Sequence, residues 1–300
     1  MPALAFNVPT GVQPEVVAGG SHAAACGASV EPAAGNPPII VLESVSKTFD
    51  AHGHRVVAID GVDLRVDEGE FVALIGPSGC GKSTLFNIVA GLQDADSGGT
   101  IRFGGERRKS TELLGKVSFM PQRDLLFPWR RVIDNVILAL EVEGMSRSDA
   151  RARALPMFAG FGLSGFERHY PNQLSGGMRQ RVALMRTFLF ERPLMLLDEP
   201  FGALDSLTRA MMQRWLLDVW QLHRRTVLFI THDIDEAIFL GDRVVVMTAR
   251  PGRMKLSVEV GIERPRHADI RTSAAFLEIR KTLLAAIEEE SMKSFLSESV

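Results

Sequence analysis

A glycine-rich segment of nine residues contains the residue types that hold a chain of phosphates. It has the spacing G-x4-G-K-S/T. Its glycines let the backbone wrap closely, so that amide N–H groups converge on a phosphate, and a helix starting there adds its positive dipole end. Lys82 can bridge the β- and γ-phosphates, and the Ser83 hydroxyl can bind Mg²⁺. We predict a nucleoside triphosphate site made of Gly76, Pro77, Ser78, Gly79, Cys80, Gly81, Lys82, Ser83 and Thr84.

Two consecutive carboxylates follow the apolar run 194–197. At the C-terminal edge of a parallel sheet they would lie beside the phosphate-binding segment, where Asp198 can hold the Mg²⁺ shell. Glu199, one residue farther on, is placed to polarise a water for attack on the γ-phosphate. Alone, this run could simply end in solvated acids. Together with the glycine-rich segment it predicts hydrolysis of the triphosphate.

The segment Leu174-Ser175-Gly176-Gly177 offers a second place for an anion. Ser175 can cap a helix, and the amides of Gly176 and Gly177 then face outward at its positive end. A phosphate bound elsewhere in the same chain could not easily reach them. Taken alone, the pattern indicates no more than a helix cap with a glycine turn.

Short apolar runs flank these motifs and must form the strands that position them. Because such runs are apolar on both faces, they predict a buried parallel sheet covered by helices, and their alternation with helical patterns such as Lys82–Gly91 makes the fold class α/β. The predicted strands are 39–42, 71–75, 194–197, 226–230 and 243–247.

Between about residues 123 and 173 the strand pattern stops and helical periodicity replaces it, which predicts a helical insertion. Ser146 or Ser148 could cap a helix there, and Pro156 should end or kink that helix. The apolar residues that fall near one face of the first helix are Val132, Val136, Leu138 and Leu140.

The two ends of the chain have different patterns. Residues 1–38 are dominated by Ala, Gly and Pro and lack the charged and apolar regions of a secretory signal, which predicts a flexible extension without function. Residues 261–300 are predicted to form a helical tail. Its apolar face would contain Phe276, Ile279, Leu283, Leu284 and Ile287.

Composition excludes several classes of protein. With 46% hydrophobic residues the chain is neither disordered nor fibrous, and Lys+Arg 34 against Asp+Glu 36 argues against a nucleic-acid partner. No stretch is long and apolar enough to span a bilayer. Cys26 and Cys80 are predicted to be free thiols in a reducing compartment.

Over residues 39–260 the chain resembles the nucleotide-binding subunit of an ATP-binding cassette (ABC) transporter. The resemblance rests on the order and spacing of three motifs: the phosphate-binding segment, Leu-Ser-Gly-Gly and Asp198-Glu199-Pro200. The resemblance implies a P-loop NTPase fold with a parallel-sheet core and a helical subdomain at about 123–173. It implies ATP and Mg²⁺ as cofactors and ATP hydrolysis as the reaction. It also implies a homodimer, in which Ser175, Gly176 and Gly177 close on the γ-phosphate held by the other copy.

Four more positions match the family one by one. Gln122 resembles the glutamine that joins the subdomains and touches Mg²⁺ or the attacking water, and His232 resembles the histidine that contacts the γ-phosphate. Asp205 resembles the aspartate that reads the opposite subunit's site. Phe49 resembles the aromatic residue that stacks on adenine, although a phenylalanine on an edge strand could also simply pack there.

Within the family, the chain resembles the branch that imports nitrate, sulfonates or taurine at Met178, Phe127-Pro128-Trp129-Arg130 and the segment 248–253. It departs from the pattern of that branch at Leu184–Phe188 and Pro156. The branch implies two transmembrane permease subunits, an extracytoplasmic substrate-binding protein, and a peripheral location on the cytoplasmic side of the inner membrane.

Other interpretations stay open. The apolar loop 125–129 could be a groove for a permease helix or a small core under the helical subdomain. The chain could be a soluble ABC-type ATPase acting on DNA or ribosomes, but a long coiled-coil insertion or a tandem cassette is absent from the sequence. A purely regulatory nucleotide-binding module is the third interpretation, and the intact Glu199 and His232 argue against it.

Overall fold

The central strands are buried along their whole length, and this determines the architecture. The computed structural model describes residues 36–51 and 54–298. In it β3 (Phe71–Ile75), β7 (Leu194–Asp198) and β8 (Thr226–Ile230) are fully buried. Strands with no polar face need cover on both sides, and the fold supplies it.

These strands belong to a sheet with the order β10-β9-β3-β8-β7-β6 among the described residues. It also contains β6 (Val117–Met120), β9 (Arg243–Met247) and the edge strand β10 (Met254–Glu259). All neighbours pair in parallel except β10, which runs antiparallel to β9. The predicted α/β class with a parallel-sheet core is therefore confirmed.

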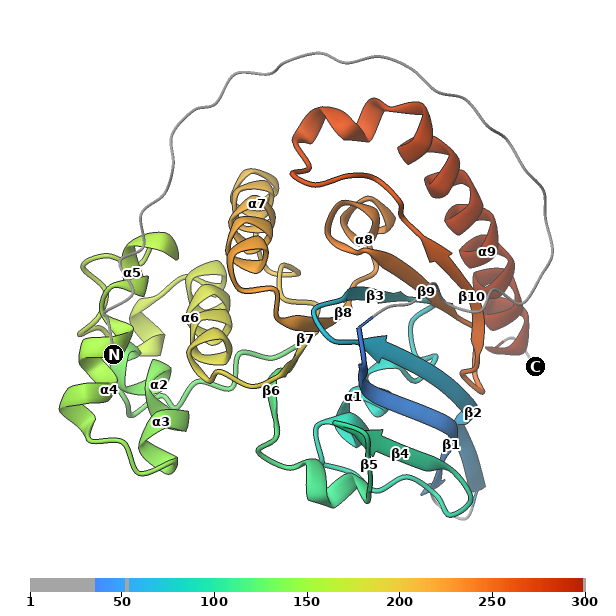
Figure 1. Cartoon of the computed structure of the whole chain (residues 1–300), viewed down its shortest axis with the longest axis horizontal. Helices are drawn as coiled ribbons and strands as arrows, with labels where there is room; N and C mark the ends of the chain where they lie inside the picture. Colours follow the sequence, from blue (N-terminus) through green and yellow to red (C-terminus); the bar gives the residue numbers. More distant parts are fainter. Residues whose placement is uncertain (1–35, 52–53, 299–300) are drawn as a thin grey trace. The chain divides into compact units, whose positions relative to one another are not determined.

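Alternating side chains of β3 enter different cores on the two faces of this sheet. Phe71, Ala73 and Ile75 pack with one set of helices, whereas Val72 and Leu74 pack with the other layer. Figure 1 shows α7, α8 and α9 on one side of the sheet and α1 with a second sheet on the other. The helices are α1 (Lys82–Val89), α6 (Gly176–Leu189), α7 (Ser206–His223), α8 (Ile234–Leu240) and α9 (Ala274–Glu298).

The second sheet is antiparallel and has the order β2-β1-β4-β5 in the described part of the chain. Of this sheet the sequence predicted only the run 39–42. Register shifts along β1 break the alternation of apolar residues, which hides the rest of the strand from a pattern search. The strands are β1 (Pro38–Ala51), β2 (His54–Asp67), β4 (Thr100–Phe103) and β5 (Glu106–Arg108).

The helical insertion contains α2 (Val132–Val136), α3 (Leu138–Val142), α4 (Arg147–Ala154) and α5 (Met157–Gly160). Ser146, rather than Ser148, caps α4 by accepting a hydrogen bond from Asp149 N at 3.2 Å. Pro156 stands between α4 and α5, as its interruption of the pattern predicted. Short 3₁₀ turns occur at Ser110–Leu113, Pro171–Gln173 and Ala268–Thr272.

Two helices depart from the sequence predictions. α1 ends before Gly91, whose φ of +76° takes the chain out of the helix. In α9, Phe276 and Leu283 are buried as predicted, but Leu284 is 42% exposed, because it lies one residue around the helix from the buried face.

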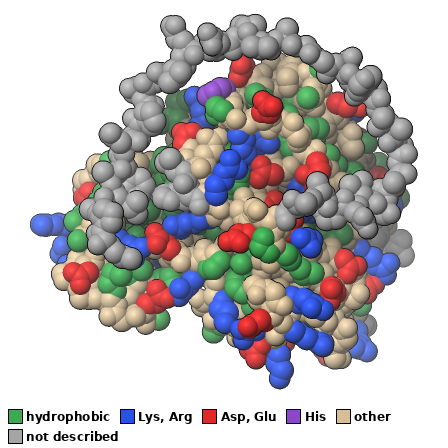
Figure 2. All heavy atoms as spheres, viewed as in Figure 1, with side chains coloured by type: hydrophobic (Ala, Val, Ile, Leu, Met, Phe, Trp, Pro, Cys, Tyr) green, Lys and Arg blue, Asp and Glu red, His purple; other side chains and the backbone are tan. Residues whose placement is uncertain are grey.

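Three further predictions concern the domain boundaries, the cysteines and the absence of a membrane span. Residues Asn36–Val300 form one compact unit, and the domain boundaries 1–38, 39–260 and 261–300 stay predictions. Cys80 is a buried free thiol, whereas Cys26 and residues 1–35 lie outside the described residues. None of the described helices is both long enough and apolar enough to cross a bilayer. On the face shown in Figure 2, acidic and basic side chains are interspersed.

Candidate active site

The phosphate-binding segment forms a tight loop between β3 and α1, which we call the phosphate loop (residues 76–84). Gly79 and Gly81 have φ values of +74° and +104°, which favour glycine. A Cβ at Gly81 would also lie 2.5 Å from the Ile59 side chain and 2.8 Å from the Ala58 carbonyl oxygen. No described side chain caps α1, so its first N–H groups are available to an anion.

Lys82 is buried beneath this loop. Its ammonium group donates hydrogen bonds to the carbonyl oxygens of Gly76 and Pro77, each at 2.8 Å. These bonds hold a positive charge beside the N-terminus of α1. The loop, the helix end and Lys82 together fit the phosphates of ATP.

Asp198 lies at the end of β7 and is buried. Burial raises the pKa of its carboxyl group above the ordinary value, although a hydrogen bond with Ser83 and the charge of Lys82 act in the opposite direction. No group of three or more His, Cys, Asp or Glu side chains that could hold a metal occurs in the described ranges. A carboxylate, a hydroxyl and substrate phosphates fit Mg²⁺, which keeps several waters and needs few protein ligands.

Gln122 and His232, predicted from the family resemblance, both lie close to one carboxylate oxygen of Glu199, which was predicted from its position after a buried strand. Glu199 Oε2 accepts a long hydrogen bond from Gln122 Nε2 at 3.4 Å, and His232 Nδ1 lies 3.4 Å from the same atom. Gln122, Glu199 and His232 follow β6, β7 and β8, neighbouring parallel strands that end at one edge of the sheet. This arrangement places a base, an amide and an imidazole where a water could be activated.

A glutamine that the sequence analysis did not identify ties this group to α6. Gln180 is buried; its Nε2 donates to Glu199 O at 3.0 Å, and its Oε1 accepts from Ala203 N at 2.8 Å. Gly177 supports the same contact, since a Cβ there would lie 3.1 Å from Leu204 Cδ2. The sequence feature that could have identified Gln180 is its position as a polar residue on the apolar face of a helix.

Glu236 was also missed, and it supports the segment that contains His232. This buried carboxylate of α8 accepts from Gln213 Nε2 at 2.7 Å and is hydrogen-bonded to the Thr231 hydroxyl. Burial raises its pKa. Thr231 in turn accepts from Asp233 N at 3.0 Å, so the residues on both sides of His232 are held.

The residues predicted to act on a second copy serve as helix caps in this chain. Ser175 caps α6 by accepting from Met178 N at 3.2 Å, and the space around Gly176 is open as far as 3.8 Å, where Arg179 lies. Asp205 caps α7, and the hydrogen bond from the Thr208 backbone lowers its pKa. Their action on a partner stays a prediction.

Phe49 lies in β1, opposite Val56, and is half-buried. The ammonium group of Lys47 lies 5.7 Å from the centre of its ring. A half-exposed ring is compatible with both interpretations, stacking on adenine or packing in the sheet. The stacking role stays a prediction.

Comparison with known proteins agrees with this geometry. The family model described as ABC transporter matches residues 59–202. An uncharacterised ABC transporter ATP-binding protein of Methanocaldococcus jannaschii is 46% identical over 84% of this chain and 92% of its own length. An aliphatic sulfonates import ATP-binding protein of Bacillus cereus is 41% identical over 83% of this chain and 96% of its own.

Solved structures give the same result. The dimeric structure of a bacterial ABC transporter cassette superposes with a TM-score of 0.68 at 33% identity, covering 75% of this chain and all of that one. A post-hydrolysis state of an ATP-binding cassette bound to ADP and phosphate also has a TM-score of 0.68, at 32% identity. With this site and these relatives, the chain belongs to the ABC transporter family as an ATP-binding subunit that hydrolyses ATP.

Proposed function

We propose that this chain energises the uptake of a small anion, such as an aliphatic sulfonate, taurine or nitrate. Membership of the family establishes an ATPase, and the proposal adds direction and cargo. The 41% identity to an aliphatic sulfonates import ATP-binding protein supports it. The observation that carries it is an exposed aromatic surface directly after Gln122, described below.

The proposed hydrolysis uses Glu199 as the base. A water hydrogen-bonded to its carboxylate attacks the γ-phosphorus, its proton passes to Glu199, and the bond to the bridging oxygen of ADP breaks. Gln122 orients Glu199 through Oε2, and His232 reaches toward the γ-phosphate with its other ring nitrogen. Ser83, Asp198 and Gln122 would hold Mg²⁺, which when bound neutralises charge on the phosphates.

We propose that two copies sandwich two ATP molecules. In each copy Ser175 caps a helix that has open space around Gly176 at its N-terminus, and Asp205 caps another helix. An anion held on the phosphate loop of one copy would complete the site at Ser175–Gly177 of the other. The dimeric solved relative supports this arrangement.

The aromatic surface consists of Leu125, Phe127 and Trp129, which are 60%, 36% and 72% exposed. The rings of Phe127 and Trp129 stack, with centroids 5.1 Å apart and planes 12° from parallel. Exposed stacked aromatic side chains favour a docking groove over a small internal core. A cytoplasmic helix of the permease is the proposed occupant.

The backbone beneath this surface is held firmly. Asn135 accepts from Phe127 N at 2.7 Å and donates to Phe127 O at 3.1 Å. Arg186 of α6 donates to the carbonyl oxygens of Asp124 and Leu125 at 2.8 and 3.0 Å. A movement of the docked helix would therefore reach α6, which carries Ser175 at its N-terminus.

In this proposal the chain lies peripherally on the cytoplasmic side of the membrane, bound to two permease subunits. An extracytoplasmic binding protein would deliver the cargo. Specificity for the anion would then reside in those partners, because the ATP subunit does not touch the cargo.

The test is an affinity purification of tagged protein from detergent-solubilised membranes of the host, followed by mass spectrometry. We expect a multi-span permease to co-purify with the wild type and to be lost with Trp129→Ala. Leu114→Ala, which truncates an exposed apolar residue outside this surface, is the matched control. Recovery of only soluble or ribosomal partners would overturn the importer proposal and leave a soluble ABC-type ATPase.

A further inference from the structure

The segment 248–253, between β9 and β10, lies directly against the phosphate loop. A Cβ at Gly252 would fall 2.0 Å from the carbonyl oxygen of Cys80, a distance that excludes any side chain there. Gly252 also donates to Ala58 O at 2.9 Å and accepts from Asp60 N at 3.0 Å. These bonds fix the segment to β2 while it touches the loop.

Arg250 extends from this segment to the phosphate loop. Its Nε and one Nη both donate to the carbonyl oxygen of Gly79, at 3.2 and 3.0 Å. In a planar trans peptide the C=O and the following N–H point in opposite directions. By holding the Gly79 carbonyl outward, Arg250 keeps Cys80 N–H directed to the inside of the loop, where it now lies 3.4 Å from Pro77 O.

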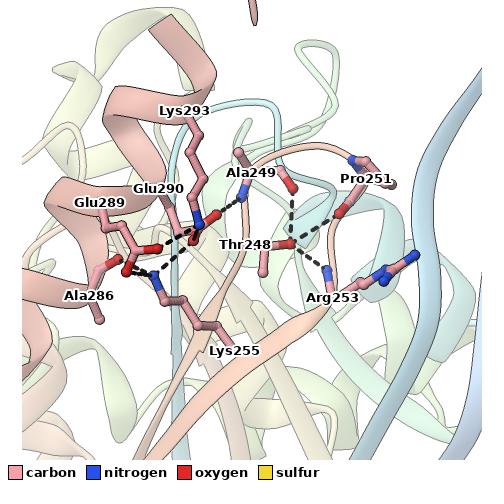
Figure 3. Close-up of polar contacts among 9 residues, drawn as sticks. All are labelled: Thr248, Ala249, Pro251, Arg253, Lys255, Ala286, Glu289, Glu290 and Lys293. Carbon is pink, nitrogen blue, oxygen red and sulfur yellow. Dashed lines mark hydrogen bonds and ion pairs between the residues drawn. The ribbon is translucent and has the colours of Figure 1, made fainter. Parts of the chain in front are cut away.

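The residue before Arg250 is held by the C-terminal helix α9. Glu290 Oε2 accepts a hydrogen bond from Ala249 N at 2.9 Å, and its other oxygen accepts from Lys255 and Lys293, each at 2.8 Å. Figure 3 shows this carboxylate between the two ammonium groups and the Ala249 amide.

Glu290 is only 2% exposed on its side chain. Burial alone would raise its pKa, but the hydrogen bonds from Lys255, Lys293 and Ala249 outweigh it and lower the pKa to about 2. The contact therefore carries a full charge at neutral pH, and it fixes the backbone from which Arg250 extends.

We propose that Arg250 is a positioning residue of the phosphate loop and that α9, through Glu290, holds it in place. The C-terminal helix then contributes to nucleotide binding although none of its residues lies in the phosphate loop. This inference concerns a single subunit and its nucleotide, so it does not depend on the importer proposal.

The first test compares Arg250→Ala, Arg250→Lys and Arg253→Ala in the full chain. Arg253 lies in the same segment, but its exposed side chain pairs with Asp60 instead of the phosphate loop. We measure the Kd of ADP·Mg²⁺ by calorimetry, and KM and kcat for ATP. Loss of two charged hydrogen bonds to a solvent-accessible carbonyl should raise Kd and KM about fivefold, with kcat within about twofold.

Arg250→Lys should recover part of the affinity because lysine keeps one donor, and Arg253→Ala should bind like the wild type. Wild-type affinity in Arg250→Ala would overturn the proposal. An equal loss in Arg253→Ala would overturn it as well, since the effect would then belong to the whole segment.

The second test isolates α9 by comparing Glu290→Ala with Glu289→Ala. Glu289 contacts the same two lysines but not Ala249, and its side chain is 57% exposed. Hydrogen exchange of the amides at 79–85 should accelerate in Glu290→Ala and not in Glu289→Ala. Unchanged exchange in both would overturn the role of α9.

Because Glu290→Ala leaves two lysines without a buried partner, its folding is checked by thermal unfolding, and a double variant supplies a second criterion. If Glu290 acts through Arg250, Arg250→Ala with Glu290→Ala should bind ADP·Mg²⁺ no more weakly than Arg250→Ala alone. Fully additive losses would show that α9 acts by another route and overturn that part of the proposal.

Discussion

Glu199 has a φ of +49°, a backbone conformation that is uncommon for a residue with a side chain. Glu199 N donates to Ile230 O at 3.0 Å, and Glu199 O accepts from Gly202 N at 3.1 Å. Gln180 adds a third bond to this residue. A strained conformation that the surroundings hold in place is typical of functional sites.

We predict that Glu199→Gln lowers ATP turnover by at least about a hundredfold while ATP binding is retained, because an amide cannot accept the proton of the attacking water. Phosphate release and the Kd of ATP measure the two effects separately. The control is Glu191→Gln, which alters ion pairs with Arg153 and Arg225. Near-normal hydrolysis in Glu199→Gln would refute the role as base.

Lys82→Ala should weaken the binding of ATP by about tenfold or more. The ammonium group that now contacts the carbonyl oxygens of Gly76 and Pro77 supplies a charged donor to the phosphates, and alanine removes it. Calorimetric titration with ATP·Mg²⁺ measures the change. Unchanged affinity would contradict the assignment of the phosphate loop.

Asp198→Asn should stabilise the nucleotide-free protein at neutral pH while abolishing hydrolysis. Burial raises the pKa of Asp198, so the folded state binds its proton more tightly than the unfolded state. The charged carboxylate therefore costs stability above its folded pKa, and this cost disappears as the pH falls through that pKa.

Thermal unfolding of wild type and Asp198→Asn across pH 4 to 8 tests this prediction. The advantage of the variant should be largest at high pH and should shrink as the pH falls. A variant that is less stable at pH 8 would show that the bond with Ser83 and the charge of Lys82 outweigh burial.

Among the helices and strands, the sequence best predicted those whose local pattern of apolar residues agrees with their position in the fold. The strand Phe71–Ile75 is apolar on both faces and ends at a glycine, so its burial and its turn followed from the sequence. The antiparallel sheet was missed, because β1 is bulged. Gln180 and Glu236 were missed because their partners lie 19 or more residues away or on another element, and composition does not reveal such pairs.

Gln180 connects α6 to the loop after β7, and this contact can be tested by mutation. Gln180→Ala should lower kcat more than it changes the KM for ATP, because it leaves Ala203 N without its partner and removes one of the two hydrogen bonds to Glu199 O. Loss of these two hydrogen bonds, which are partly buried, should also lower the free energy of unfolding by about 1–2 kcal/mol.

Thr187→Val is the matched control for Gln180→Ala. Thr187 is buried on the same helix but donates only to Ala183 O of that helix in the described structure, at 2.9 Å. Urea unfolding and steady-state kinetics compare the two variants. Equal losses of kcat would show that any change in α6 impairs the site, which would contradict a specific role for Gln180.

For the whole molecule, parallel strands determine which distant residues meet. β3, β6, β7 and β8 point the same way, so their C-terminal ends bring the phosphate loop, Gln122, Glu199 and His232 to one edge of the sheet. This grouping could be predicted from the order of motifs along the chain. The supporting contacts could not, because they depend on the packing of α6, α8 and α9.

Assembly of two copies should depend on ATP. We predict that Glu199→Gln forms a dimer with ATP in size-exclusion chromatography with light scattering, and that adding Ser175→Arg returns it to a monomer. Arginine at that position would obstruct the open N-terminus of α6 without touching the phosphate loop. ATP binding by the monomer should persist; a dimer that survives Ser175→Arg would place the interface elsewhere.

The stacked pair on the aromatic surface has a practical consequence. Of the three tryptophans in the chain, Trp220 is buried and Trp215 half-buried, whereas the indole of Trp129 faces solvent. Its emission should therefore be red-shifted and readily quenched by iodide. A transmembrane subunit seated over it would shift the emission to the blue and shield it from the quencher, so the protein contains its own optical reporter of assembly.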